Sequence, residues 1–144
     1  MFGQQRKLGV ALVAGLLLVP AVASAWRAHN RHEVFPIGNG VYEVLSRPGS
    51  GPADFWCAIG DYAIRQDRVA ANQRVYIWRA IGASVTRDGY KAVQFAYRPP
   101  KGADTSTGLS LTVKRAGDNL NASFARSYCF GDSFEDDFIR RRWP

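Results

Sequence analysis

Hydrophobic residues recur along one stretch of the chain with the period of a helix. In residues 52–66, Phe55, Ile59 and Tyr62 are spaced four and three positions apart, which places them on one helical face. Pro52 suits the first helical turn, where its missing N–H leaves no hydrogen bond unmade. The sequence therefore predicts an amphipathic helix over 52–66 whose apolar face covers another element.

Most other apolar residues alternate with polar ones or form short runs rich in β-branched and aromatic side chains, as in β-strands. The segments of this kind are residues 41–45, 74–81, 90–97, 109–113 and 120–124. Asp88-Gly89 precedes the third of them and is typical of a tight hairpin turn. The segment 74–81 is apolar on both faces, which indicates either a covered sheet or a dimer interface.

The order of these elements defines the expected fold class. One strand, one helix and then four antiparallel strands predict an α+β domain, in which the helix packs on a curved antiparallel sheet of about five strands. This order matches the cystatin-like roll, and a small β-sandwich with a peripheral helix is the alternative. Gly60, inside the helix, costs about 1 kcal/mol relative to alanine. We therefore expect a strand or an aromatic ring to approach the helix closely at this glycine.

The start of the chain has the form of a secretory signal peptide. Arg6 and Lys7 precede an apolar run over 8–19, and Ala23-Ser24-Ala25 is a small-x-small cleavage site. The apolar run is shorter than the roughly 20 residues of a membrane-spanning helix. We therefore expect cleavage after this site, a periplasmic or secreted mature protein, and no transmembrane span in it.

The predicted boundaries divide the chain into four parts. They are the signal peptide (1–25), an N-terminal arm (26–37), a single α+β domain (38–130) and a charged C-terminal tail (131–144). The formal net charge falls from +7 to +5 once the two basic residues of the signal peptide are removed. This excess favours anionic partners in general, and the alternative is that it only serves solubility. We expect an unknown protein or an anionic envelope component as the partner, and not nucleic acid.

The C-terminal tail carries a basic and aromatic cluster. Its members are Arg140, Arg141, Arg142 and Trp143. Arginine side chains beside a tryptophan can contact anionic lipid or polysaccharide. The alternative is a frayed terminus without a role in binding.

Two cysteines in an exported chain most simply form one disulfide. Cys57 and Cys129 are 72 positions apart, and loop-closure theory assigns such a bond about 4 kcal/mol. A catalytic thiol needs a histidine partner, but His29 and His32 lie in the predicted arm. The His29-x-x-His32 spacing offers two metal ligands without a third. The sequence therefore predicts neither a metal site nor a cofactor.

Three polar residues of the predicted helix are the only catalytic candidates: Asp54, Asp61 and Tyr62. A roll can form a pocket between its helix and its sheet, where a carboxylate of raised pKa would act as a general base. Alternatively, Asp54 stabilises the start of the helix and Tyr62 fills the core. Asp61 is then solvated or pairs with Arg65, four positions later.

One segment resembles known proteins. Phe55-Trp-Cys-Ala-Ile-Gly-Asp-Tyr-Ala63, followed by Arg74-Val-Tyr-Ile-Trp78 and Val85-Thr86, is similar to a group of uncharacterised small secreted proteins of alphaproteobacteria. The resemblance covers residues 41–130. It implies export and a single domain, and it supplies no activity.

These observations favour a non-enzymatic periplasmic or secreted binding module. Its expected contact surfaces are the exposed face of the sheet and the loops 47–52 and 99–107, because loops on a rigid scaffold commonly carry recognition. One alternative is a small hydrolase-like enzyme, or a ligand-binding roll, with a pocket between helix and sheet. Another is a basic structural protein that associates with the cell envelope.

Overall fold

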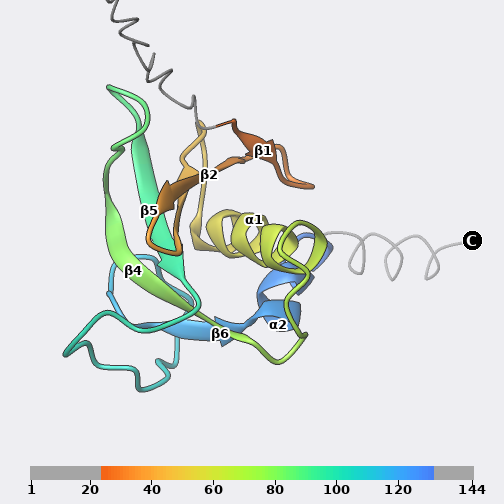
Figure 1. Ribbon diagram of the computed structural model, residues 1–144, viewed down its shortest axis with the longest axis vertical. Helices are drawn as coiled ribbons and strands as arrows, with labels where there is room; N and C mark the ends of the chain where they lie inside the picture. Colours follow the sequence, from red (N-terminus) through yellow and green to blue (C-terminus); the bar gives the residue numbers. More distant parts are fainter. Residues whose placement is uncertain (1–23, 132–144) are drawn as a thin grey trace, which may run out of the picture.

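The computed structural model describes residues 24–131, which form one antiparallel sheet curled around a helix (Figure 1). Residues 1–23, most of the predicted signal peptide (1–25), lie outside the described residues, as do the tail residues 132–144 with the cluster Arg140–Trp143. The described elements are β1 (Trp26–Arg27), β2 (Glu33–Gly38), β3 (Val41–Leu45), α1 (Pro52–Arg65), β4 (Arg74–Ala83), β5 (Lys91–Ala96), β6 (Asn119–Asn121) and α2 (Ala122–Ser127).

The six strands are ordered β1-β2-β3-β5-β4-β6, and every neighbouring pair is antiparallel. Because β3 and β4 are both antiparallel to β5, they run in the same direction on either side of it, and α1 connects them. The sheet curls from β1 to β6 with α1 on its concave side, and α2 lies next to α1 (Figure 1). The prediction of an α+β fold with a helix on a curved antiparallel sheet is confirmed.

The local predictions around α1 are accurate. The helix begins at Pro52 as expected and ends one residue earlier than predicted, and β3 has the predicted bounds 41–45. β4 and β5 form the predicted hairpin, with Gly89 at a positive φ of 79° in its turn. These elements depend on contacts within a short stretch of chain, which the sequence pattern records.

The predicted N-terminal arm is wrong, because residues 26–37 form β1 and most of β2. Val34 of β2 pairs with Trp26 of β1 and with Val44 of β3, and its side chain is fully buried. The two strands bring the sheet to six, one more than expected. Both are short and β2 contains Pro36, so neither shows the long alternation by which a strand is identified.

The last two predicted strands are also wrong. Residues 109–113 form an irregular segment in which Leu109 is fully exposed, and one backbone bond, from Ile81 N to Val113 O at 2.9 Å, links its end to β4. In place of a strand over 120–124, the chain forms the short strand β6 and then α2. The change follows from Asn121, whose side-chain oxygen accepts a hydrogen bond from Phe124 N at 2.7 Å and so caps the helix.

The main core lies between α1 and the concave face of the sheet. Trp56 of α1 and Phe95 of β5 are fully buried, with ring centroids 5.0 Å apart. The indole N–H of Trp56 donates to Thr112 O at 3.1 Å, so the irregular segment closes one end of the core. Val75 and Ile77 of β4 are fully buried in this cluster.

The predicted disulfide is confirmed. Cys57 on α1 and Cys129 in the turn after α2 are bonded, with their Cα atoms 4.8 Å apart. The bond therefore joins α1 to the end of α2, and not to the end of the strand predicted over 120–124. Gly60 is the point of closest approach: a Cβ atom built there would lie 2.3 Å from the backbone nitrogen of Arg126 on α2. The close neighbour of this glycine is a helix, not a strand or an aromatic ring.

None of the helices among residues 24–131 has the length and apolar character needed to cross a membrane.

Candidate anion-binding site

Asp61, one of the three catalytic candidates, is fully buried and fully engaged. Its Oδ2 lies 3.0 Å from Arg65 Nη1 and accepts a hydrogen bond from His29 N at 2.9 Å. Its Oδ1 lies 3.0 Å from Arg126 Nε. The alternative role, pairing with Arg65, is the observed one. Because both oxygens are engaged and the side chain is fully buried, a substrate cannot reach Asp61, as general-base catalysis requires.

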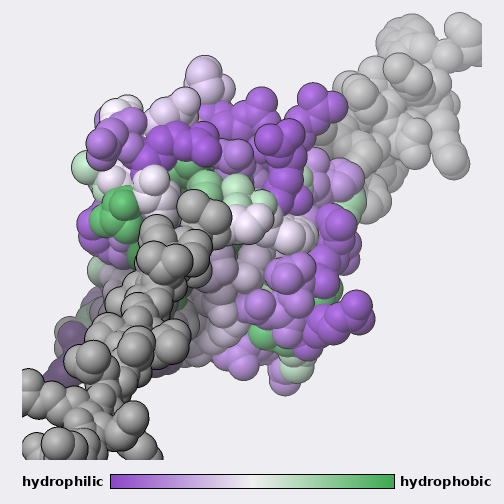
Figure 2. Space-filling model, turned by 45° about the horizontal axis from the view of Figure 1, so that its top comes forward, coloured by the Kyte–Doolittle hydropathy of each residue, from purple (hydrophilic) through white to green (hydrophobic). Residues whose placement is uncertain are grey.

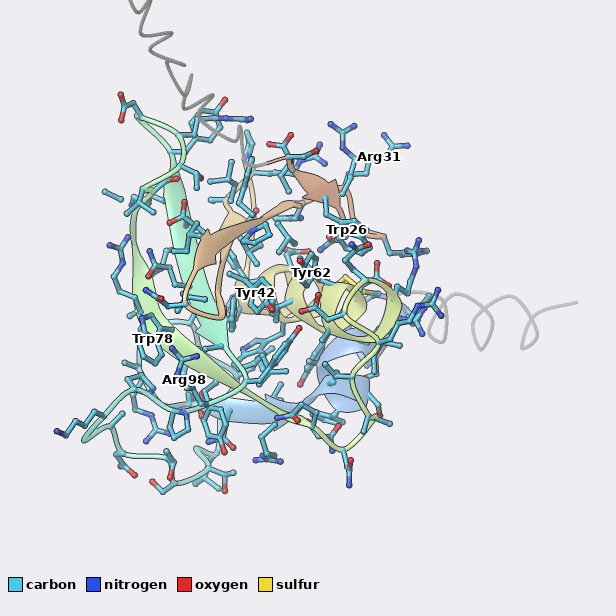
Figure 3. All side chains as sticks on the ribbon, in the orientation of Figure 1. Trp26, Arg31, Tyr42, Tyr62, Trp78 and Arg98 are labelled. Atoms are coloured by element: carbon cyan, nitrogen blue, oxygen red, sulfur yellow. A yellow bond between two sulfur atoms is a disulfide. The ribbon has the colours of Figure 1, made fainter. Side chains whose placement is uncertain are left out.

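Asp54 and Tyr62 also have the structural roles that were the alternative. Asp54 Oδ2 accepts a hydrogen bond from Gly51 N at 2.8 Å, which satisfies a backbone donor at the start of α1. The ring of Tyr62 packs against Trp26 and Tyr42, with centroids 5.3 and 5.0 Å away, and the three rings lie in a row across α1 (Figure 3). Burial, together with the nearby Asp67 carboxylate, raises the pKa of Tyr62 to about 12. The phenol therefore stays protonated at neutral pH.

The two histidines lie in different environments. The His29 ring packs against Phe130 at 5.0 Å, and the His32 ring is buried beside Phe55 at 5.9 Å. His32 Nε2 shares a 2.7 Å hydrogen bond with Ser50 Oγ. Within the part of the chain that the structure describes, no group of three His, Cys, Asp or Glu side chains is placed to hold a metal ion.

The structure brings together a different set of residues, around a cavity of about 360 Å³ at the β1 end of the molecule. We call it the arginine cavity. It is lined by Arg27, Arg31, Glu33, Leu45, Ser46, Arg47, Pro48, Arg87 and Tyr90. Asp54, Asp61 and Tyr62 are not among these residues.

Each of the four arginines comes from a different segment. Arg27 is on β1, Arg31 is in the turn between β1 and β2, Arg47 is in the loop before α1, and Arg87 is in the hairpin between β4 and β5. The pairing of the strands assembles these segments. Ser46 N, next to Arg47, donates to Lys91 O at the start of β5 at 2.8 Å, which holds the loop against the hairpin.

One carboxylate, that of Glu33, lines the cavity. Its Oε2 lies 2.8 Å from Arg87 Nη1, and its Oε1 lies 3.8 Å from Arg27 Nη2. The Arg87 guanidinium also lies over the rings of Tyr90 and Phe35, at 5.2 and 5.9 Å from their centroids. These contacts fix the position of Arg87 before any ligand binds.

Arg31 and Arg47 differ from the other two arginines because neither forms an ion pair with a carboxylate of residues 24–131. Arg47 Nη1 donates to the backbone oxygen of Arg31 at 3.1 Å, so the two residues are adjacent. Arg31 is in the left-handed region at φ 67°, which few non-glycine residues adopt. It lies at the β1 end of the molecule, where its side chain extends outward (Figure 3).

The lining of the cavity carries four positive charges and one negative charge, a net charge of +3. Guanidinium groups bind carboxylate and phosphate oxygens through paired N–H donors. Leu45, Pro48 and the half-exposed ring of Tyr90 add an apolar wall. On the face that Figure 2 shows, hydrophilic residues predominate and hydrophobic ones form small separate patches. The cavity can therefore hold a small anion that has an apolar or ring-shaped part.

A buried carboxylate supports the hairpin that carries Arg87 and Tyr90. Glu43 on β3 is fully buried and accepts hydrogen bonds from Val85 N, Thr86 N and Thr86 Oγ1, at 3.1, 3.1 and 2.7 Å. Ser84 Oγ and Gln94 Nε2 donate to the same carboxylate. Burial alone would raise the pKa of Glu43, but these hydrogen bonds outweigh it and hold the pKa below its ordinary value. Glu43 therefore fixes the base of the hairpin in its ionised form.

Two other cavities have a lining less suited to a charged ligand. One, of about 450 Å³, is larger than the arginine cavity but is lined by the β4–β5 hairpin itself, where Lys91 and Asp88 oppose each other in charge. The other, of about 210 Å³, lies between the irregular segment 107–111 and α2. Volume alone does not identify a site, and the arginine cavity has the convergent polar groups.

Sequence reasoning identified one part of this site, the loop 47–52. It missed Arg27, Arg31, Glu33 and Arg87, because they are spread over 60 positions and no local motif connects them. The signal that could have indicated them is the number of arginines in segments that flank strands.

Comparison of the chain with protein-family models, with curated proteins and with solved structures finds no match.

Proposed function

We propose that this protein is an exported, non-enzymatic binding module that holds an anionic ligand in the arginine cavity. One observation carries the proposal: among residues 24–131, four arginines from four separate segments line a cavity to which a single carboxylate contributes. The positive charges of these arginines repel one another, which lowers the stability of the folded protein. A bound anion would offset this repulsion.

The engagement of the catalytic candidates supports binding over catalysis. Asp61 is ion-paired to Arg65 and Arg126, Asp54 caps a helix, and Tyr62 is a core residue of raised pKa. Export rests on the signal-peptide pattern of residues 1–25, and the disulfide is compatible with it.

The test is a titration of the purified protein with benzoate and with inorganic phosphate at low ionic strength, monitored by NMR of the backbone and arginine Nε–H groups. We expect saturable shifts confined to the residues that line the cavity. The affinity should fall as salt is added, because ions screen the attraction.

A matched pair of variants localises the binding. Arg31→Gln combined with Arg47→Gln removes two charges from the cavity, and we expect it to abolish the shifts. Arg68→Gln combined with Lys101→Gln removes two charges from exposed positions outside the cavity and should leave binding intact. Equal loss in both double variants, or shifts spread over the whole surface, would contradict a specific site.

A further inference from the structure

We infer that the arginine cavity selects a phosphate monoester, with two negative charges, over a phosphate diester, with one. This inference rests on the proposed function and specifies the class of its ligand. The charge pattern within the cavity carries it.

The four arginines fall into two pairs with different charge balance. Arg27 and Arg87 share the carboxylate of Glu33, so this trio has a net charge of +1 and its members are already oriented. Arg31 and Arg47 have no carboxylate partner among residues 24–131 and leave two positive charges to be matched. A dianion neutralises both, whereas a monoanion leaves one guanidinium uncompensated.

The number of terminal phosphate oxygens also favours a monoester over a diester. A phosphate monoester presents three terminal oxygens, and a diester presents two. Two guanidinium groups that each donate a pair of N–H bonds can both bind the three terminal oxygens of a monoester by sharing one of them. They would compete for the two terminal oxygens of a diester. The hydrogen bond from Arg47 Nη1 to Arg31 O holds the Arg47 guanidinium beside the Arg31 backbone, and both residues line the cavity.

The backbone of Arg31 supports a binding role for this turn. Its φ of 67° is unusual for arginine and is maintained by the hydrogen bond from Arg31 N to Ala28 O at 2.8 Å. Uncommon backbone conformations of this type cluster at ligand-binding positions. The same turn is tied to the next loop, because His32 Nε2 bonds to Ser50 Oγ and Ser50 Oγ accepts from Arg47 N at 2.8 Å.

The apolar wall indicates that the phosphate is attached to an organic group. Leu45, Pro48 and Tyr90 line the cavity beside the arginines, and Tyr90 is half-exposed. A volume of about 360 Å³ lies within the roughly 300–1,000 Å³ of small-molecule sites. The organic group is either that of a free small molecule or the glycerol of a lipid such as phosphatidic acid.

The test compares phenyl phosphate, a monoester, with methyl phenyl phosphate, the matched diester, by isothermal titration calorimetry at pH 7.5. We expect the monoester to bind at least tenfold more tightly. This preference should shrink toward unity at pH 5, because the monoester dianion takes up one proton near pH 6 and becomes a monoanion like the diester. Arg31→Gln combined with Arg47→Gln should remove the preference, and Arg68→Gln combined with Lys101→Gln should retain it.

The ratio of the two affinities is the readout because protein groups also respond to pH. The charged groups that face the ligand are Arg27, Arg31, Glu33, Arg47 and Arg87, with His32 behind the turn. Methyl phenyl phosphate keeps its single charge between pH 5 and pH 7.5, so any change in its affinity measures the response of the protein groups. The ratio therefore reports the charge of the ligand.

Lipid vesicles distinguish a phosphate on a lipid headgroup from a phosphate on a free small molecule. Co-sedimentation with phosphatidic acid, a monoester lipid, but not with phosphatidylglycerol, a diester lipid, identifies a lipid headgroup. Binding of phenyl phosphate without vesicle binding identifies a free organic phosphate, and both outcomes support the inference. Equal affinity for monoester and diester, both lost in the Arg31/Arg47 variant, overturns the inference and leaves the proposed function standing. Absence of binding by all these ligands overturns both.

Discussion

Arg126 Nε lies 3.0 Å from Asp61 Oδ1, across 65 positions of the chain and between α2 and α1. The Asp61 side chain is fully buried, whereas that of Arg126 is about one-third exposed, so the arginine lies at the edge of the interface between the two helices. The disulfide between Cys57 and Cys129 and the close backbone approach at Gly60 join the same two helices. Three independent contacts therefore hold α2 on α1.

The first prediction concerns this ion pair. Asp61→Asn keeps the shape of the side chain but removes the charge that Arg65 and Arg126 balance, and its amide has one acceptor oxygen in place of two. Hydrogen bonds to charged groups contribute about 1.5–3 kcal/mol each. We expect the free energy of unfolding in urea to fall by about 2 kcal/mol. Asp88→Asn, in the exposed hairpin turn, is the control and should change it by less than about 0.5 kcal/mol.

The second prediction concerns Gly60. Alanine is the better helix former, yet its Cβ would lie 2.3 Å from Arg126 N and 2.7 Å from Ala125 C, and both are backbone atoms that cannot rotate away. We expect Gly60→Ala to lower the free energy of unfolding by about 1–3 kcal/mol, the usual cost of overpacking. Gly82→Ala is the matched control, because its Cβ would have only Ala80 O nearby, at 3.7 Å. An unchanged or raised stability in Gly60→Ala would mean that α2 does not approach α1 as closely as described.

The elements that the sequence predicted well are those whose pattern is local. Phe55, Ile59 and Tyr62 mark α1 because a helical face repeats every three to four residues, and the structure buries all three. The β4–β5 hairpin is marked by Asp88-Gly89 for the same reason. In each case the residues that specify the element lie within it.

The elements that the sequence mispredicted depend on a helix cap that interrupts the strand pattern or on partners far away in the chain. Leu120, Ala122 and Phe124 alternate like a strand, but the Asn121 cap and the disulfide at Cys129 turn the chain into α2. Apolar and polar residues also alternate from Leu109 onward, yet this segment does not form a strand of the sheet and Leu109 is fully exposed.

The candidate site could not be predicted for the same physical reason. Arg27 and Arg87 meet at Glu33 only because β1 pairs with β2 and the β4–β5 hairpin extends beside them. Sequence alone gives the number of arginines, and the fold decides which of them converge.

The third prediction concerns Glu43. In Glu43→Gln, an NH2 group replaces one carboxylate oxygen and cannot accept hydrogen bonds. Some of the donors of Ser84, Val85 and Thr86 therefore lose their partner. We expect a loss of about 3 kcal/mol in the free energy of unfolding, since unpaired buried donors cost about 1–3 kcal/mol each. Amide hydrogen exchange at Val85 and Thr86 should accelerate more than exchange within α1. Uniform acceleration across the domain would show that Glu43 does not act on the hairpin in particular.

The fourth prediction concerns pH. Burial lowers the pKa of His32 from its ordinary value of 6.5, against smaller opposing effects of the Asn30 backbone and Asp54. The unfolded chain therefore takes up a proton at a higher pH than the folded protein does. It follows that the stabilising contribution of the neutral imidazole is complete above about pH 7.5 and declines as the pH falls through 6.5.

Urea unfolding at pH 7.5 and at pH 5.5 measures this effect, and we expect a lower free energy of unfolding at pH 5.5. The pH range of this effect is separate from that of Glu43. Because the pKa of Glu43 is lowered in the folded protein, its stabilising contribution declines only as the pH falls below about 4.5, the ordinary pKa of the group. His32→Asn should reduce the difference between the two pH values, while His29→Gln, at an exposed position, should preserve it. A difference that survives His32→Asn and disappears in His29→Gln would assign the pH dependence to the other histidine. The contact of His32 with Ser50 would then have no part in it.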